Sequence, residues 1–179
     1  MLFDYHTHSA FSDDSDTPLK DMLDQACRLG LSEIAVTDHF DPGYPDPEYP
    51  FELAFDEYHR TLEQYQKDYE GRLQIVKGIE MGIQHDQLDR CARAAQAYDY
   101  DYIIGSFHCA LGEPLYQGRF FEGKTAKRHS STILHTFMTI SAFIRTTAAA
   151  AISIWWPGTV RWRPLPSVTT ETLWRPSSK

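Results

Sequence analysis

The last third of this chain has almost no acidic residues, and the first two thirds have no tryptophan. Of the 25 Asp and Glu residues, 24 lie within residues 1–125, and only Glu171 lies beyond. Residues 1–125 carry a net charge of −14 and residues 126–179 a net charge of +6, and the second part holds all four tryptophans. A basic, aromatic segment can indicate nucleic-acid binding, but so abrupt a change also fits a segment in the wrong reading frame.

Other sequence features are absent as well. No run of about 18 uncharged apolar residues could span a membrane, and the N-terminus lacks the basic and apolar regions of a signal peptide. The three cysteines, Cys27, Cys91 and Cys109, are scattered and odd in number, and the first two occupy apolar helical positions. We therefore expect buried, reduced thiols in a cytoplasmic protein with no membrane partner. Neither a Gly-rich phosphate loop nor a Gly-x-Ser-x-Gly elbow is present.

Residues 1–108 read as repeated β-α units. The hydrophobic pattern predicts strands at residues 2–6, 33–38, 73–79 and 100–105, and helices at residues 18–29, 55–70 and 86–98. Alternating strands and helices favour an α/β fold with a parallel sheet or barrel. The four prolines within residues 40–52 predict an irregular or lid-like loop between the second strand and the second helix.

Local signals refine two of the helices. Thr17 is a candidate N-cap for the first helix, Pro18 suits its first turn, and Gly30 is a candidate terminator. In the second helix, aromatic and apolar side chains recur at helical spacing and are expected to face the core: Tyr58, Leu62, Tyr65 and Tyr69.

Potential metal ligands follow the predicted strands. His6 and His8, at i and i+2 on a strand, point to the same side of it. Further candidates stand at the ends of the later strands or in the loop after the first: Asp13 or Asp14, His39, Glu80 and His108. In parallel α/β folds the chemistry lies at the carboxyl ends of the strands, which is where these residues fall.

Mixed carboxylate and imidazole ligands favour Mn²⁺, Fe²⁺ or Zn²⁺ over a structural Cys-rich zinc site. A carboxylate such as Glu80 can bridge two ions. Paired ions can hold a bridging hydroxide and clamp a phosphoryl group during in-line displacement. Hydrolysis of a phosphate ester is therefore the expected chemistry.

Four segments together resemble the first four motifs of the PHP (polymerase and histidinol phosphatase) superfamily, most closely its histidinol-phosphatase branch. They are Asp4-x-His6-x-His8, Thr37-Asp38-His39, Gly78-Ile79-Glu80 and Gly105-Ser106-x-His108. The resemblance covers residues 1 to about 127. It implies that these residues are the N-terminal portion of a distorted (β/α)7 barrel with up to three divalent ions.

The resemblance also implies a ligand set. His6, His8 and Glu80 would hold the first ion, Asp14 and His39 the second, and Glu80 and His108 the third. Spacing favours Asp14 over Asp13. The other four histidines match no motif and are expected on the surface or in loops: His59, His85, His129 and His135.

The family pattern also contains a Gly-His-x-Asp motif and a late Asp-x-His motif, and neither occurs here. With suitable codons, the segment Ala151–Val160 read one base earlier spells Gly-His-Leu-Asp-Leu-Val-Ala-Arg-Tyr-Gly. We therefore divide the chain into a metal-binding barrel portion, 1–127, and an atypical tail, 128–179, and hypothesise a one-base frame change near Lys127. Resequencing the coding DNA across Ala126–Arg128 tests this, and an unchanged frame contradicts it.

The resemblance implies a metal-dependent phosphomonoesterase that hydrolyses histidinol phosphate in histidine biosynthesis. The partner would be a small phosphorylated substrate rather than nucleic acid. The general acid stays unassigned because its best candidates belong to the missing motifs. Two alternatives remain, a phosphodiesterase or nuclease of the same superfamily and an inactive metal-binding fragment, although the acidic charge of residues 1–125 disfavours a polyanion groove.

Overall fold

The computed structural model describes residues 1–110 and 112–115, and in this part strands and helices alternate. The main elements are β1 (Phe3–Thr7), α1 (Leu19–Arg28), β2 (Glu33–Val36), β3 (His39–Phe40), α2 (Phe55–Asp68), β4 (Gln74–Gly82), α3 (Leu88–Ala97) and β5 (Tyr102–Ser106). The 3₁₀ helix η1 (His85–Gln87) precedes α3, and the short strands β6 (Cys109–Ala110) and β7 (Glu113–Pro114) follow β5. The proposed boundary at residue 127 and the tail 128–179 lie outside the described residues.

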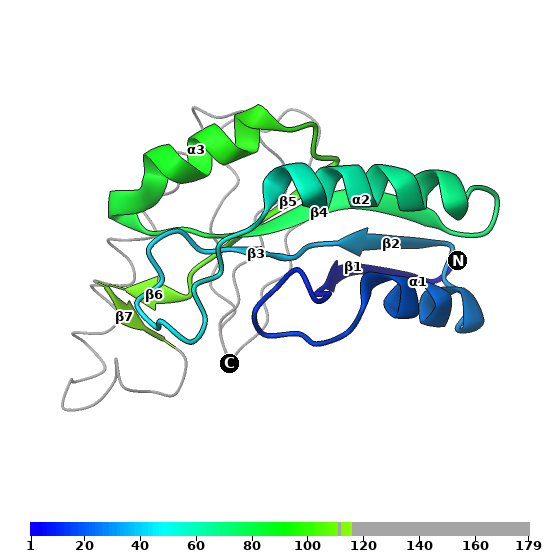
Figure 1. Ribbon diagram of the computed structural model, residues 1–179, viewed down its shortest axis with the longest axis horizontal. Helices are drawn as coiled ribbons and strands as arrows, with labels where there is room; N and C mark the ends of the chain where they lie inside the picture. Colours follow the sequence, from blue (N-terminus) through cyan, green and yellow to red (C-terminus); the bar gives the residue numbers. More distant parts are fainter. Residues whose placement is uncertain (111, 116–179) are drawn as a thin grey trace, which may run out of the picture.

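The main sheet is parallel and curled into half of a barrel. β1 pairs with β2, and β4 pairs with β2, β3 and β5. β2 and β3 follow one another along β4, because Val36 pairs with Lys77 and His39 pairs with Glu80. Figure 1 shows α2 and α3 on the same side of the sheet and α1 beside β1. The expected α/β fold with a parallel sheet is confirmed.

The first helix begins differently from the sequence expectation. Pro18, rather than Thr17, occupies the N-cap position, and no side chain caps the helix. Thr17 instead uses its carbonyl to accept a hydrogen bond from Ala10 N–H at 2.8 Å, so a tertiary contact determines its backbone. The C-terminal signal is confirmed: Gly30 has φ +75° and follows the last helical turn.

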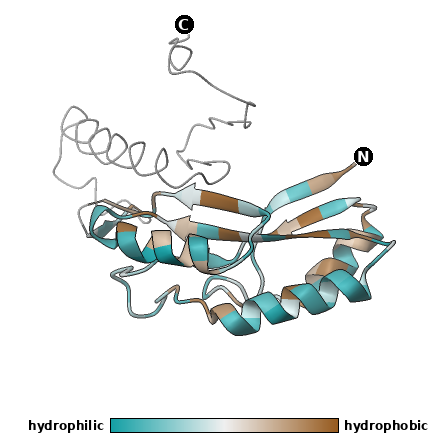
Figure 2. Ribbon diagram, turned by 90° about the horizontal axis from the view of Figure 1, so that it is seen from above, coloured by the Kyte–Doolittle hydropathy of each residue, from teal (hydrophilic) through white to brown (hydrophobic). Residues whose placement is uncertain are grey.

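The core lies between the sheet and the helices. Tyr58, Leu62 and Tyr69 are buried and Tyr65 packs against the core, as expected. Figure 2 shows hydrophobic stretches along the strands, while the surface of α2 is largely hydrophilic. Burial raises the pKa values of Cys91 and Cys109 to about 12, which keeps both as thiols.

His59 is a correction. It was expected on the surface or in a loop, but it lies on α2 with only 7% of its surface exposed. Its ring stacks on Tyr98 at 4.3 Å between centroids and meets Tyr100 edge-on at 4.6 Å. Aromatic neighbours brought together by the fold, rather than any local pattern, bury this histidine.

Residues 41–54 contain no helix or strand, which confirms the irregular loop. One residue anchors it at two points. Phe51 N–H donates to Asp13 Oδ2 at 2.6 Å, and Phe51 C=O accepts from Asp41 N–H at 3.0 Å. Phe51 adopts φ +46°, which is unusual for a side chain of this size and indicates that surrounding contacts determine the loop. No helix in the described part of the chain is long and apolar enough to cross a membrane.

Tyr58 ties the sheet together at the break between β2 and β3. Its hydroxyl lies 3.0 Å from both Val36 O and Gly78 O, and it accepts from Asp38 N–H at 3.3 Å. We predict that Tyr58→Phe lowers the free energy of unfolding by about 1–3 kcal/mol, because buried backbone groups lose their partner. Urea denaturation measures this.

The matched control is Tyr65→Phe on the same helix, whose hydroxyl makes no hydrogen bond in the described part of the chain. This control should leave stability unchanged. Equal stability of the two variants would contradict the bridging role of Tyr58.

Candidate metal centre

The structure brings all six predicted ligand side chains to one end of the sheet. His6 lies on β1 and His8 just beyond it, Asp14 lies in the following loop, and His39 lies on β3. Glu80 lies on β4, and His108 lies two residues after β5. Parallel pairing aligns the carboxyl ends of these strands, so residues more than 100 positions apart in sequence meet there.

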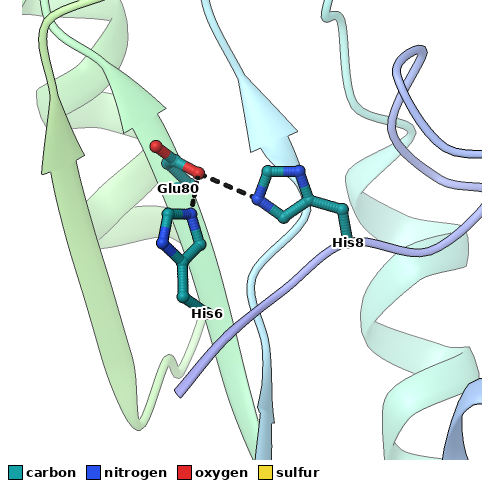
Figure 3. Close-up of side chains that lie close together, drawn as sticks. All are labelled: His6, His8 and Glu80. Atoms are coloured by element: carbon teal, nitrogen blue, oxygen red, sulfur yellow. Dashed lines mark hydrogen bonds and ion pairs between the residues drawn. The ribbon is translucent and has the colours of Figure 1, made fainter. Parts of the chain in front are cut away.

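Glu80 lies at the centre of this arrangement and is 1% exposed. Its Oε2 lies 2.6 Å from His6 Nε2 and 3.0 Å from His8 Nε2, as Figure 3 shows. Both imidazoles thus point to the same side of the chain, as their i, i+2 spacing predicts. The β1–β2 register shifts between Asp4 and Thr7, the segment that contains His6.

The other oxygen of Glu80 faces a second set of groups. Oε1 lies 3.1 Å from His108 Nε2 and accepts a hydrogen bond from Ser106 Oγ at 2.5 Å. Each carboxylate oxygen therefore has its own imidazole partners. This division is what a carboxylate shared between two ions requires.

Asp14, not Asp13, points into the site. Asp14 Oδ2 lies 3.2 Å from His8 Nδ1 and 3.5 Å from His39 Nε2. Asp13 instead accepts the hydrogen bond from Phe51 N–H and so anchors the 41–54 loop. The adjacent carboxylates therefore have separate roles, one facing the site and one structural.

Buried hydrogen bonds hold the turn that presents Asp14. Asp38 accepts from Ser9 N–H at 2.6 Å, from Ser9 Oγ at 2.8 Å and from Ser12 Oγ at 2.9 Å. Ser12 Oγ also accepts from His39 N–H at 2.8 Å. Burial raises the pKa of Asp38, and the hydrogen bonds from the two serines oppose that rise. The loop after β1 is thus attached directly to the backbone of β3.

The site couples acids and imidazoles strongly. Although burial opposes it, Asp14 and Glu80 raise the pKa of His8 to about 9. Burial lowers the pKa of His108, but Asp41 and Glu80 outweigh this effect and raise the pKa to about 10. The same contacts hold the pKa values of Glu80 and Asp14 well below their usual range, against the effect of burial. A set of groups that retains protons this firmly also attracts a divalent cation, and binding of the cation displaces the protons.

These residues fit divalent ions. Three groups each offer three donor atoms within 4.8 Å of one another: His6, His8 and Glu80; His8, Asp14 and His39; and His39, Glu80 and His108. Ligands at about 2.1 Å from one ion lie roughly 3–4 Å apart, so small adjustments suffice. The nitrogen and oxygen donors suit zinc, manganese or iron.

Two contributors were missed from the sequence. Asp41 lies against His39 and His108, and Ser106 donates to Glu80. Asp41 stands two residues after His39, and the i, i+2 alternation that pairs His6 with His8 indicates only that it lies on the same side of the strand as His39. His85, expected on the surface, is exposed, and His129 and His135 lie outside the described residues.

Comparisons with known proteins show what the chain is similar to. The PHP domain family model matches residues 4–153. The histidinol-phosphatase of Lactococcus lactis is 30% identical over 118 residues, covering 66% of this chain and 43% of that protein. A probable histidinol-phosphatase of Clostridium acetobutylicum is 27% identical over 128 residues, covering 71% and 47%. The chain thus spans less than half the length of these curated relatives.

A solved structure supports the same fold. The crystal structure of the Lactococcus lactis histidinol phosphate phosphatase, complexed with zinc, L-histidinol and phosphate, superposes with a TM-score of 0.72 at 28% identity. The match covers 79% of this chain and 53% of that one. The half-barrel seen here therefore corresponds to part of a larger barrel in that protein.

The separate roles of Asp13 and Asp14 can be tested. We predict that Asp14→Asn weakens zinc binding by at least about 100-fold, because an amide is a poor replacement for an anionic ligand. Asp13→Asn should bind zinc nearly as the wild type does, because its amide oxygen can still accept from Phe51 N–H. Competition with a chromophoric chelator measures both affinities, and the reverse ranking would contradict the assignment.

Proposed function

The chain belongs to the PHP domain family, and from that premise we propose that it is a metal-dependent phosphomonoesterase acting on histidinol phosphate. The products would be histidinol and phosphate, a step of histidine biosynthesis. The single observation that carries the proposal is the convergence of four imidazoles on the buried carboxylate of Glu80, with Asp14 beside two of those imidazoles.

The residues divide naturally into three ligand sets. His6, His8 and Glu80 would hold one divalent ion, Asp14 and His39 with His8 a second, and Glu80 with His108 and His39 a third. The zinc in the Lactococcus lactis structure makes zinc the first candidate, with manganese and iron as the others. When bound, such ions neutralise charge on a phosphoryl group and lower the pKa of water to near neutrality.

The chain's own residues shape the surroundings of that reaction. Ser106 and the imidazoles fix both oxygens of Glu80, while Asp38 fixes the turn that carries Asp14. His6 is the most exposed of the histidine ligands, with 41% of its side chain accessible, so substrate would approach from its side.

An aromatic cluster packs beside His39. The ring of Phe51 lies 4.6 Å from that of His39, and Tyr44 and Tyr49 pack on Phe51 at 5.1 and 6.0 Å between centroids. An aromatic cluster at this position suits a phosphate carried on a small organic group. This feature and the acidic charge of residues 1–125 support a small phosphomonoester over a nucleic-acid substrate.

The reading-frame hypothesis for residues 128–179 also stays a proposal. Since the chain spans less than half the length of its curated relatives, activity of the chain as written is part of what must be tested.

The activity is tested on the full chain loaded with zinc or manganese. We predict hydrolysis of histidinol phosphate in preference to a phosphodiester such as bis(p-nitrophenyl) phosphate. His8→Ala should lower kcat/KM by about 100-fold or more, because two of the ligand sets contain it. His85→Ala, at an exposed histidine that belongs to none of the three donor groups, is the matched control and should change nothing.

The outcomes separate the alternatives. Preferential hydrolysis of the diester would instead support the alternative function, a phosphodiesterase or nuclease of the same superfamily. Absence of turnover, together with fewer than one tightly held ion per chain, would indicate the inactive fragment.

A further inference from the structure

Asp41 contacts two histidines that belong to different strands. It directly follows β3 and is 1% exposed. Its Oδ2 accepts a hydrogen bond from His108 Nδ1 at 2.7 Å and lies 3.4 Å from His39 Nδ1. One buried carboxylate therefore faces the same ring nitrogen of two candidate ligands.

The opposite nitrogens of these rings face the metal-binding carboxylates. His108 Nε2 lies 3.1 Å from Glu80 Oε1. His39 Nε2 lies 3.5 Å from Asp14 Oδ2 and 3.8 Å from Glu80 Oε2. Because a neutral imidazole carries one proton, an acceptor beside Nδ1 keeps the proton there and leaves the Nε2 lone pair free for an ion.

Asp41 lies close to His39 but slightly beyond hydrogen-bonding distance. At 3.4 Å the separation exceeds the usual upper limit of a hydrogen bond by about 0.2 Å. His39 Nδ1 and Asp41 Oδ1 are both buried and lack a hydrogen-bond partner in the described residues. A ring nitrogen of His39 and a carboxylate oxygen of Asp41 thus lack hydrogen-bond partners on adjacent side chains within the part of the chain that the structure describes.

The fold reserves space for this carboxylate. A Cβ atom at Gly82 would collide with Asp41 Oδ1, so a larger residue there would displace Asp41. The Asp41 backbone is held as well, since its N–H donates to Phe51 O and its C=O accepts from Tyr44 N–H, both at 3.0 Å. None of the three donor groups in the described part of the chain includes Asp41.

We propose that Asp41 is a positioning residue that fixes His39 and His108 as Nε2 ligands of the metal centre. It acts through the two rings rather than by binding an ion itself. The inference rests on the proposed metal-dependent function. It adds one carboxylate that couples two of the three ligand sets, and it assigns to Gly82 the role of admitting that carboxylate.

The test compares Asp41→Ala and Asp41→Asn in the full chain. Asp41→Ala should weaken zinc binding about 10- to 100-fold in competition with a chromophoric chelator. Asp41→Asn should lose less, because its amide oxygen can still accept from Nδ1–H. Glu48→Gln removes a charge from the same loop at an exposed position and should retain wild-type affinity.

A spectroscopic readout separates positioning from a general loss of stability. In ¹H–¹⁵N correlation spectra of the zinc-loaded wild type, His39 and His108 should both show protonated Nδ1 and metal-bound Nε2. Asp41→Ala should lose this pattern in at least one ring, and Gly82→Ala should do the same with Asp41 intact.

The zinc affinities and the ring-nitrogen patterns together test the role of Asp41. Wild-type zinc affinity in Asp41→Ala, or zinc bound through Nδ1 in the wild type, overturns the inference while leaving the proposed function in place. A wild-type chain that takes up no zinc, manganese or iron overturns both. Equal losses in Asp41→Asn and Asp41→Ala, with the nitrogen pattern unchanged, would reduce Asp41 to a structural residue.

Discussion

A carboxylate buried within a parallel sheet is unfavourable unless cations or hydrogen-bond donors surround it, and Glu80 is such a carboxylate. The imidazoles of His6, His8 and His108 and the hydroxyl of Ser106 satisfy it. The strands must therefore end where these side chains can reach β4. This pairing lowers the pKa of Glu80 and raises the pKa of His108, and a divalent ion bound here would take the place of the imidazole protons.

Around this centre lies a second layer of buried groups that connects neighbouring strands. Tyr58 bridges the carbonyls of β2 and β4 at the break between β2 and β3. Asp38, within that break, holds the turn that carries Asp14, and Asp41 lies just beyond it against two histidines. The interruption of the strand at Thr37–Asp38 is thus where the fold gains the polar groups that orient the ligands. Interactions that stabilise the sheet and interactions that shape the site share the same few residues.

Local sequence patterns were sufficient to predict much of the fold and of the candidate site. Periodicity located the three helices and four of the strands, but not the short strands β3, β6 and β7. Gly30 marked a helix end, and the i, i+2 spacing of His6 and His8 gave their common direction. Position at the strand ends was enough to group the six candidate ligands, because parallel strands bring their carboxyl ends to one edge of a sheet. The assignment of these ligands to particular ions stays a prediction.

The features that were missed depend on contacts between distant segments. Thr17 fails as a cap because its carbonyl pairs with Ala10, and His59 is buried by Tyr98 and Tyr100 from the segment that precedes β5. Asp41 has no local pattern beyond its spacing from His39, and its proposed role becomes visible only with His108 beside it.

The most direct test of a metal centre at the strand ends is anomalous diffraction from crystals of the zinc-loaded full chain. Zinc peaks at about 2.0–2.2 Å from both oxygens of Glu80, with His6, His8 and His108 among the ligands, are the predicted result. Peaks confined to surface residues, with Glu80 still hydrogen-bonded to its histidines, would contradict a metal centre at these strand ends.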